Sequence, residues 1–266
     1  MGLGRAYLAL LRGQARSQAA YRTSFVVELV ANVFITAWDV VLVLVLFGVS
    51  GELGGFALRE AMVMVGLSSF AFAAADVTVG NIERVRTYVR TGLLDAVLVR
   101  PLRPLPQLLL ADLPVRKVSR IVFSTAVLLL ALAAADIAWT PARVALAVVA
   151  PLAGTVFFGS VFVATASVAF WWIDSGEIAN AVTYGGREFA TYPVTVYGGW
   201  FRAVFAYGMG FAFVAYYPAL ALLGRTDPLG LPDWVGWVAP AVALPVLIAA
   251  AAVWRVGIRH YRSTGS

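Results

Sequence analysis

Long apolar runs separated by arginine-rich segments are the feature that most constrains the fold of this 266-residue chain. A helix needs about 20 mostly apolar residues to cross the hydrocarbon core of a bilayer. Such runs lie at 24–49, 61–80, 121–135, 144–173, 201–223 and 235–254. With 61% apolar and only 13% charged residues, the chain differs strongly from an ordinary soluble domain. The sequence therefore predicts an all-α integral membrane protein, with six transmembrane helices in one domain over residues 1–266.

The basic residues predict the orientation of these helices, because positive charge is retained on the cytoplasmic side. The N-terminal segment holds four, the segment 81–120 holds eight and the C-terminal tail holds three, whereas the opposite loops hold only Arg59, Arg143 and Arg225. Both termini are therefore expected in the cytoplasm. Since the arginines gather at the ends of apolar runs, they are interpreted as topology determinants, and no nucleic-acid partner is expected.

Residues 1–22 have the pattern of an interfacial helix. At 100° per residue, Arg5, Arg12 and Arg16 share one face and apolar side chains share the opposite one. Such a helix lies along the inner leaflet before the first span. The alternative is a disordered basic tail, because three glycines in this segment weaken a helix.

The segment 81–120 is long enough to dock a partner. Residues 82–90 are expected to be helical, Gly92 to end that helix, and residues 93–99 to form a second short helix that Pro101 stops. The proline-rich run 100–106 is then extended. The alternative is a plain arginine-rich loop held at the lipid headgroups.

The stretch 174–200 allows two layouts, because charged residues lie among Gly and Tyr before a break at Tyr192 and Pro193. In the first, it is a cytoplasmic loop between spans four and five. In the second, residues 176–192 form a polar fifth span, and the apolar stretch after Pro193 is re-entrant at the outer face. Irregular backbone at membrane depth requires protein or water around it, so a re-entrant segment would belong to a pore or gate.

The chain lacks the residues of several kinds of catalytic site. A phosphate-binding loop requires Gly-x-x-x-x-Gly-Lys-Ser/Thr, and the only lysine, Lys117, is followed by Val118. There is no cysteine, and the single histidine, His260, lies in the tail. Accordingly we expect no enzyme activity, no catalytic residues, no metal site and no cofactor in this chain.

Three acidic residues fall within the predicted spans: Glu28, Asp39 and Asp76. An ionisable group at membrane depth is costly and suggests a function or a buried partner. Glu28 and Asp76 lie toward the inner leaflet, where an ion pair with an arginine such as Arg22 or Arg84 is the favoured interpretation. For Asp39 we leave open whether it lines a substrate pathway or makes structural hydrogen bonds.

Several motifs resemble those of the ABC-2 type permeases, in particular the six-span membrane subunits of bacterial ABC exporters. They are the amphipathic N-terminus, Gly92-Leu93-Leu94-Asp95, Leu98-Val99-Arg100-Pro101, Phe189 to Pro193 (FATYP) and Ala212 to Leu220 (AFVAYYPAL). Each motif alone is weak, but their order and spacing extend over nearly the whole chain.

The resemblance implies both a function and site residues. The chain would be a permease subunit for an amphipathic or lipid-like substrate in the bacterial cytoplasmic membrane. Its partners would be membrane lipid, a second permease subunit, the same or similar, and a separate ATPase subunit that binds ATP and magnesium. The implied ATPase-coupling residues are Gly92, Leu94, Asp95, Leu98, Arg100 and Pro101. The implied outer gate includes Tyr192, Pro193, Tyr217 and Pro218, within a region 176–223 that holds span five and a re-entrant segment.

Two other functions remain open from the sequence. The chain could be a secondary transporter driven by protons or sodium through Asp39, Asp76 and Glu28. It could also be a noncatalytic membrane scaffold. Neither function would require a partner ATPase, and a scaffold would give no substrate flux.

Overall fold

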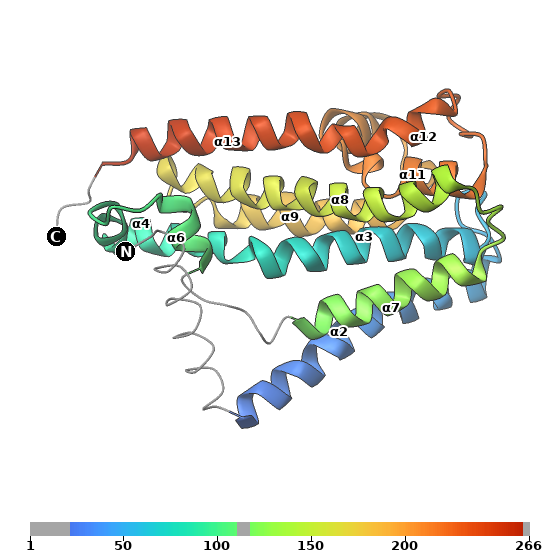
Figure 1. The fold of residues 1–266 in the computed structure, drawn as a ribbon, viewed down its shortest axis with the longest axis horizontal. Coiled ribbons are helices and arrows are strands. Elements are labelled where there is room, and N and C mark those ends of the chain that lie inside the picture. Colours follow the sequence, from blue (N-terminus) through green and yellow to red (C-terminus); the bar gives the residue numbers. More distant parts are fainter. Residues whose placement is uncertain (1–21, 111–117, 263–266) are drawn as a thin grey trace.

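The computed structural model of the protein describes residues 22–110 and 118–262, and within them the only β pairing is an isolated bridge between Leu53 and Phe56. The all-helical fold class is thereby confirmed for this part of the chain. The longer helices are α2 (Arg22–Ser50), α3 (Leu58–Thr78), α7 (Val118–Ala134), α8 (Pro141–Ser167), α9 (Gly176–Thr191) and α13 (Ala243–His260). In Figure 1 they lie roughly side by side, with α13 and α2 on opposite sides of the bundle.

The shorter elements gather at the two ends of the bundle (Figure 1). At one end, here called the arginine-rich end, lie η1 (Gly80–Arg84), α4 (Val85–Arg90), α5 (Leu93–Leu98), α6 (Pro104–Leu110) and η3 (Val168–Phe170). Toward the other, here called the loop end, lie η4 (Val194–Val196), α10 (Gly199–Arg202), η5 (Ala203–Gly208), η6 (Phe211–Phe213), α11 (Tyr216–Leu223), α12 (Trp234–Val238) and η7 (Ala239–Val242).

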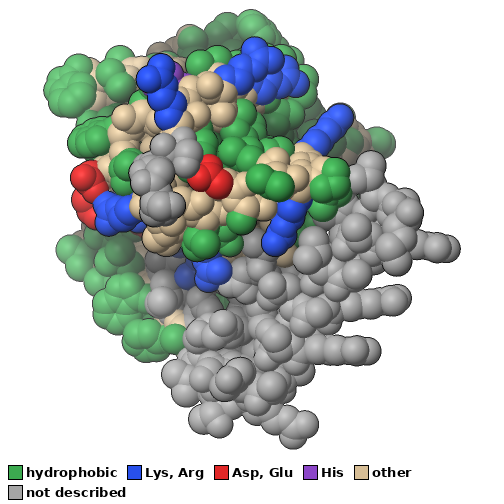
Figure 2. Space-filling view, turned by 90° about the vertical axis from the view of Figure 1, so that its left-hand side faces the viewer, with side chains coloured by type: hydrophobic (Ala, Val, Ile, Leu, Met, Phe, Trp, Pro, Cys, Tyr) green, Lys and Arg blue, Asp and Glu red, His purple; other side chains and the backbone are tan. Residues whose placement is uncertain are grey.

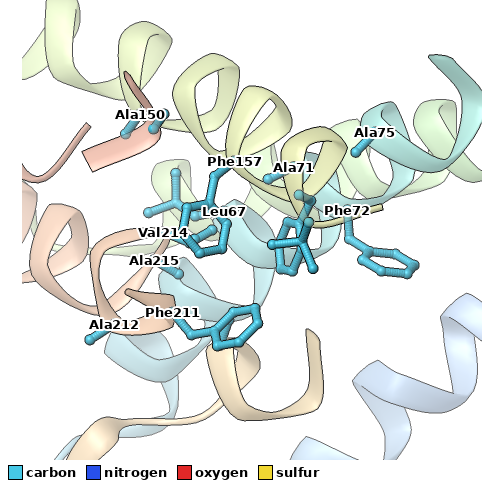
Figure 3. Close-up of a cluster of buried hydrophobic side chains, with 14 of the residues drawn as sticks. Leu67, Ala71, Phe72, Ala75, Ala150, Phe157, Phe211, Ala212, Val214 and Ala215 are labelled. Atoms are coloured by element: carbon cyan, nitrogen blue, oxygen red, sulfur yellow. The ribbon is translucent and has the colours of Figure 1, made fainter. Parts of the chain in front are cut away.

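Helix α3 is the centre of the core and packs against α7, α8 and α9. Glycines permit its closest contacts. A Cβ at Gly66 of α3 would collide with the backbone of Leu128 in α7, and one at Gly154 of α8 would collide with Ala71 of α3. Small residues let helices approach closely where lipid offers no hydrophobic driving force. Between these contacts, a cluster of aromatic and aliphatic side chains from α3, α8 and η6 fills the interior (Figure 3).

The start of α8 follows from its sequence. Thr140 is the N-cap, and its hydroxyl accepts a hydrogen bond from the backbone N–H of Arg143 at 3.3 Å. Pro141 occupies the first helical position, where its missing N–H costs nothing. The connection from α7 to α8 is therefore a short turn at the loop end.

Three stretches of the described residues are long and apolar enough to cross a membrane: Leu58–Thr78, Pro141–Phe170 and Trp234–His260. A fourth candidate is the pair Gly199–Gly208 and Phe211–Leu223, bent by 60° at its break. Val40–Ser50 and Ser119–Ala134 are shorter apolar helices. Six spans thus stay a prediction. The interfacial helix expected at 1–22 lies outside the described residues, apart from Arg22.

The region 176–223 differs from the loop-plus-straight-span layout. Residues 176–191 form helix α9, which packs against α3 and α8 in the bundle. After Tyr192 and Pro193, the apolar stretch folds into two arms instead of one straight helix over 201–223. We call this bent pair, residues 199–223, the hairpin. Gly210 at φ +86° turns the chain between the arms. Such a bent pair fits either a broken span or a re-entrant loop, so the re-entrant segment of the second layout stays a prediction.

Candidate functional site

Residues 91–103 form a compact turn at the arginine-rich end. Gly92 separates α4 from α5 with φ +69°, a left-handed conformation that glycine adopts without strain. Within α5, Leu94 and Val97 are buried, whereas Leu93 and Leu98 are exposed. Val99, which follows α5, is 86% exposed. The two short helices predicted around Gly92 are thus confirmed.

The side chain of Gln107 in α6 fixes the backbone of this turn. Its Nε2 donates hydrogen bonds to the carbonyl oxygens of Val97 at 3.2 Å and Leu102 at 3.0 Å. Leu98, Val99, Arg100 and Pro101 therefore project from a fixed base. One part of the sequence prediction was wrong: the run 100–106 is not extended throughout, because Pro104 begins α6. Proline is favoured at this first helical position.

The six predicted coupling residues have different environments. Leu98, Arg100 and Pro101 are exposed, whereas Leu94 has no exposed surface. Leu94 is therefore a packing residue beneath the turn and not part of its outer surface. Figure 2 views this end and shows arginine side chains spread around it, among exposed apolar groups.

Asp95 of α5 lies close to the segment that follows α13. The hydroxyl of Tyr261 faces the Asp95 carboxylate, and the Tyr261 ring packs against Phe170 with centroids 6.4 Å apart. Burial, and then the neighbouring Asp95 carboxylate, raise the pKa of Tyr261 above its ordinary value.

Asp76 makes a buried ion pair. Its Oδ2 lies 2.7 Å from Nη1 of Arg120 on α7, and the Asp76 side chain is only 1% exposed. The ion pair expected for Asp76 is present, with Arg120 and not Arg84 as the arginine, whereas a contact of Asp76 with substrate stays a prediction. Glu28 and Asp39 lie on α2, but their side chains fall outside the described part of the structure.

Helix α9 has a polar face that the rest of the described chain covers only in part. Glu177, Ala181, Tyr184 and Glu188 are all exposed, and their spacing of three or four residues aligns them on one side of the helix. The hydroxyl of Tyr184 donates to Glu83 at 3.4 Å. Sequence reasoning did not single out this face, although the same spacing is present in the sequence.

The four predicted gate residues lie at two places. Tyr192 and Pro193 end α9, whereas Tyr217 and Pro218 are buried in α11. The Tyr217 hydroxyl lies within hydrogen-bond distance of the Tyr207 hydroxyl at 3.2 Å and of the Asp227 carboxylate at 3.4 Å. All four lie within residues 192–218, a segment that includes the bend of the hairpin at Gly210.

Both ends of the hairpin region are tied to the loop between α2 and α3. The hydroxyl of Thr195 donates to the carbonyl of Gly54 at 2.7 Å. Beyond α11, Arg225 donates to Glu60 at 2.5 Å and to the carbonyl of Gly55 at 3.2 Å, and its guanidinium lies over the ring of Phe56. These contacts fix the loop end of the bundle.

An apolar groove of about 710 Å³ lies between α8 and the segment α12–α13. Leu146, Val149, Val156, Trp237 and Leu244 are among its lining residues. Within residues 22–110 and 118–262, no group of His, Cys, Asp or Glu could hold a metal ion.

A family model described as an ABC-2 family transporter protein matches residues 33–265. The chain therefore belongs to the ABC-2 transporter family and is a transmembrane component of ABC transport systems, as its motifs predicted. No curated protein and no solved structure matches it significantly.

Proposed function

We propose that this chain is the permease subunit of an ABC exporter and that a separate ATPase subunit docks on the turn 91–103. The observation that carries this proposal is the exposed apolar tip of the turn, Leu98 and Val99, with Arg100 and Arg103 beside it. Exposed apolar groups on a rigid base outside the candidate spans are typical of a protein interface. ATP and magnesium would bind to the partner, and this chain would supply none of their ligands.

The proposed orientation places the arginine-rich end and both termini in the cytoplasm of a bacterial cell. Arg84, Arg90, Arg100, Arg103, Arg255 and Arg259 are on this end, and the positive-inside rule assigns such an end to the cytoplasm. The hairpin would then face the outside, where an exporter must release its substrate.

The substrate path is proposed to follow the polar face of α9. Polar side chains facing lipid would be costly, so the face with Glu177, Tyr184 and Glu188 is better placed against water or another protein. A second permease subunit, the same or similar, would enclose the path. Apolar walls beside a few polar groups suit an amphipathic or lipid-like substrate. Asp76 then stabilises the wall, because Arg120 already pairs with it.

The docking surface is tested by affinity purification of the tagged chain from native membranes in mild detergent, followed by identification of the bound ATPase and an ATPase assay. Val99→Asp and Arg100→Ala are expected to lose the ATPase while the chain still inserts normally. Thr226→Asp, which adds the same charge at an exposed site of the loop end, is expected to retain it. Leu94→Ala is a poor probe, because removing a buried leucine destabilises a fold by about 2–5 kcal/mol.

Absence of a P-loop ATPase from the wild-type complex, under conditions that preserve membrane complexes, would overturn the proposal. Ion-coupled transport would then be the better explanation. Retention of the ATPase by Val99→Asp would leave the family function in place and refute the docking site.

A further inference from the structure

The two ends of α9 contact different segments, α4 at its beginning and the hairpin near its end. Near its first residue it contacts α4, which continues into the turn 91–103, and near its last turns it contacts both arms of the hairpin. Between these contacts the helix is continuous over 16 residues, about 24 Å at 1.5 Å per residue. A continuous helix transmits a displacement of one end to the other.

The joint at the arginine-rich end depends on Gly176. A Cβ at this position would fall on the guanidinium of Arg86, so the side chain of α4 lies where residue 176 has none. Arg90, one turn further along α4, forms an ion pair with Asp174 immediately before α9. Two arginines of one short helix therefore hold the beginning of α9.

The joint at the loop end depends on Gly186 and Phe189. The ring of Phe211 from η6 lies where a Cβ of Gly186 would be, and that ring has no exposed surface. It also packs edge-on against Phe157 at 5.4 Å (Figure 3). Phe189 stacks on Tyr197 at 4.2 Å and lies 6.0 Å from Phe205 in the first arm. The last turns of α9 thus touch both arms of the hairpin.

We propose that α9 is a connecting rod, which carries a movement of the ATPase-docking turn to the hairpin through the Arg86–Gly176 and Phe211–Gly186 contacts. The inference rests on the proposed function, because the movement comes from the partner ATPase. It assigns positioning roles to Arg86, Gly176, Gly186 and Phe211, none of which carries chemistry of its own.

Adjacent glycines of α9 provide a matched control. Gly185 has no atom within 4 Å of the position of an added Cβ, whereas the neighbouring Gly186 faces Phe211. The same Gly→Ala change therefore obstructs a contact at 176 or 186, whereas at 185 it meets open space within the described part of the chain. At 176 the obstacle is the flexible end of an arginine, which can move aside, so Gly176→Ala is expected to fold and lose only the contact.

The test uses the full chain with its ATPase in lipid nanodiscs. Because the chain has no cysteine, Val196→Cys carries a single spin label at a position 47% exposed beside the hairpin. In the wild type and in Gly185→Ala, a non-hydrolysable ATP analogue is expected to change the label mobility. In Gly176→Ala and Arg86→Met this change is expected to be lost while the ATPase remains bound and active. Gly186→Ala is also expected to lose the nucleotide-dependent change in label mobility. The double variant Gly186→Ala, Phe211→Leu, in which the smaller leucine leaves room for the added methyl group, is expected to recover this change.

Each outcome separates the two ideas. A full label response in Arg86→Met and Gly176→Ala, with the ATPase bound, overturns the connecting rod and leaves the proposed function standing. So does a wild-type label that ignores nucleotide while the ATPase is bound and hydrolyses it. A wild-type chain that binds no ATPase overturns both. Arg86→Met adds no side chain at residue 176. If Gly176→Ala lowers the yield of folded protein, the label response of Arg86→Met therefore provides the test.

Discussion

Helices α8 and α9 run beside each other in one bundle, yet their outward faces differ in kind. Over 27 residues α8 has a single charged residue, Arg143 in its first turn, and its exposed face continues into the apolar groove shared with α13. Over 16 residues α9 has three, Glu177, Arg187 and Glu188. From this difference we expect lipid around the α8–α13 side and protein or water against the α9 side.

The buried ion pair between Asp76 of α3 and Arg120 of α7 contrasts with the exposed ion pair at the beginning of α9, and the largest expected effect tests this difference. Asp76→Asn leaves Arg120 without its ion-pair partner in a mostly buried place, and breaking a buried pair in this way costs about 3–5 kcal/mol. We expect a marked fall in the thermal unfolding temperature of the purified chain. The double variant Asp76→Leu, Arg120→Met should recover most of it, because a neutral apolar pair needs no compensation.

The exposed pair Arg90–Asp174 is the control for this measurement. Its side chains are 59% and 75% exposed, and solvent-exposed pairs contribute about 0–1 kcal/mol. Asp174→Asn should therefore leave the unfolding temperature nearly unchanged. Equal losses in Asp76→Asn and Asp174→Asn would mean that burial does not distinguish the two pairs.

A matched pair of aspartates tests the two environments directly. Val156 is exposed on α8 near the middle of the candidate span Pro141–Phe170, and Ala181 is exposed on the polar face of α9. Val156→Asp should reduce membrane insertion and protein level, because an acid at the centre of a lipid-facing helix costs about 2.5–3.5 kcal/mol. Ala181→Asp should be tolerated. Protein levels in isolated membranes measure both, and comparable losses would remove the distinction between the two faces.

The sequence alone was sufficient to predict helix α8 on the apolar side. It was insufficient to predict that α9, on the polar side, is a helix within the bundle. Long apolar runs and the Thr140–Pro141 start define α8 locally. By contrast, α9 has too many polar residues to meet a span criterion, and its helix lies in the bundle because α3 and α8 pack against it. Arg120 pairs with Asp76 across 44 residues of sequence, since α7 returns beside α3, and proximity in sequence suggested Arg84 instead.

The candidate site shows the same limit at single residues. Gly92 was expected to end a helix, and its left-handed conformation does so. Leu94 and Leu98 look alike in the sequence, but only the fold shows that the first is buried and the second exposed. The polar face of α9 could have been found from the spacing of Glu177, Tyr184 and Glu188. The contacts at Gly176 and Gly186 could not, because Arg86 and Phe211 come from distant segments.

The smallest expected effect concerns Gly185 on the polar side. Glycine inside a helix costs roughly 0.5–1 kcal/mol relative to alanine, and no atom of residues 22–110 or 118–262 obstructs a methyl group at residue 185. Gly185→Ala should therefore raise the unfolding temperature slightly in the isolated chain. An unchanged or lower unfolding temperature would contradict this expectation and would mean that the helix needs glycine at residue 185.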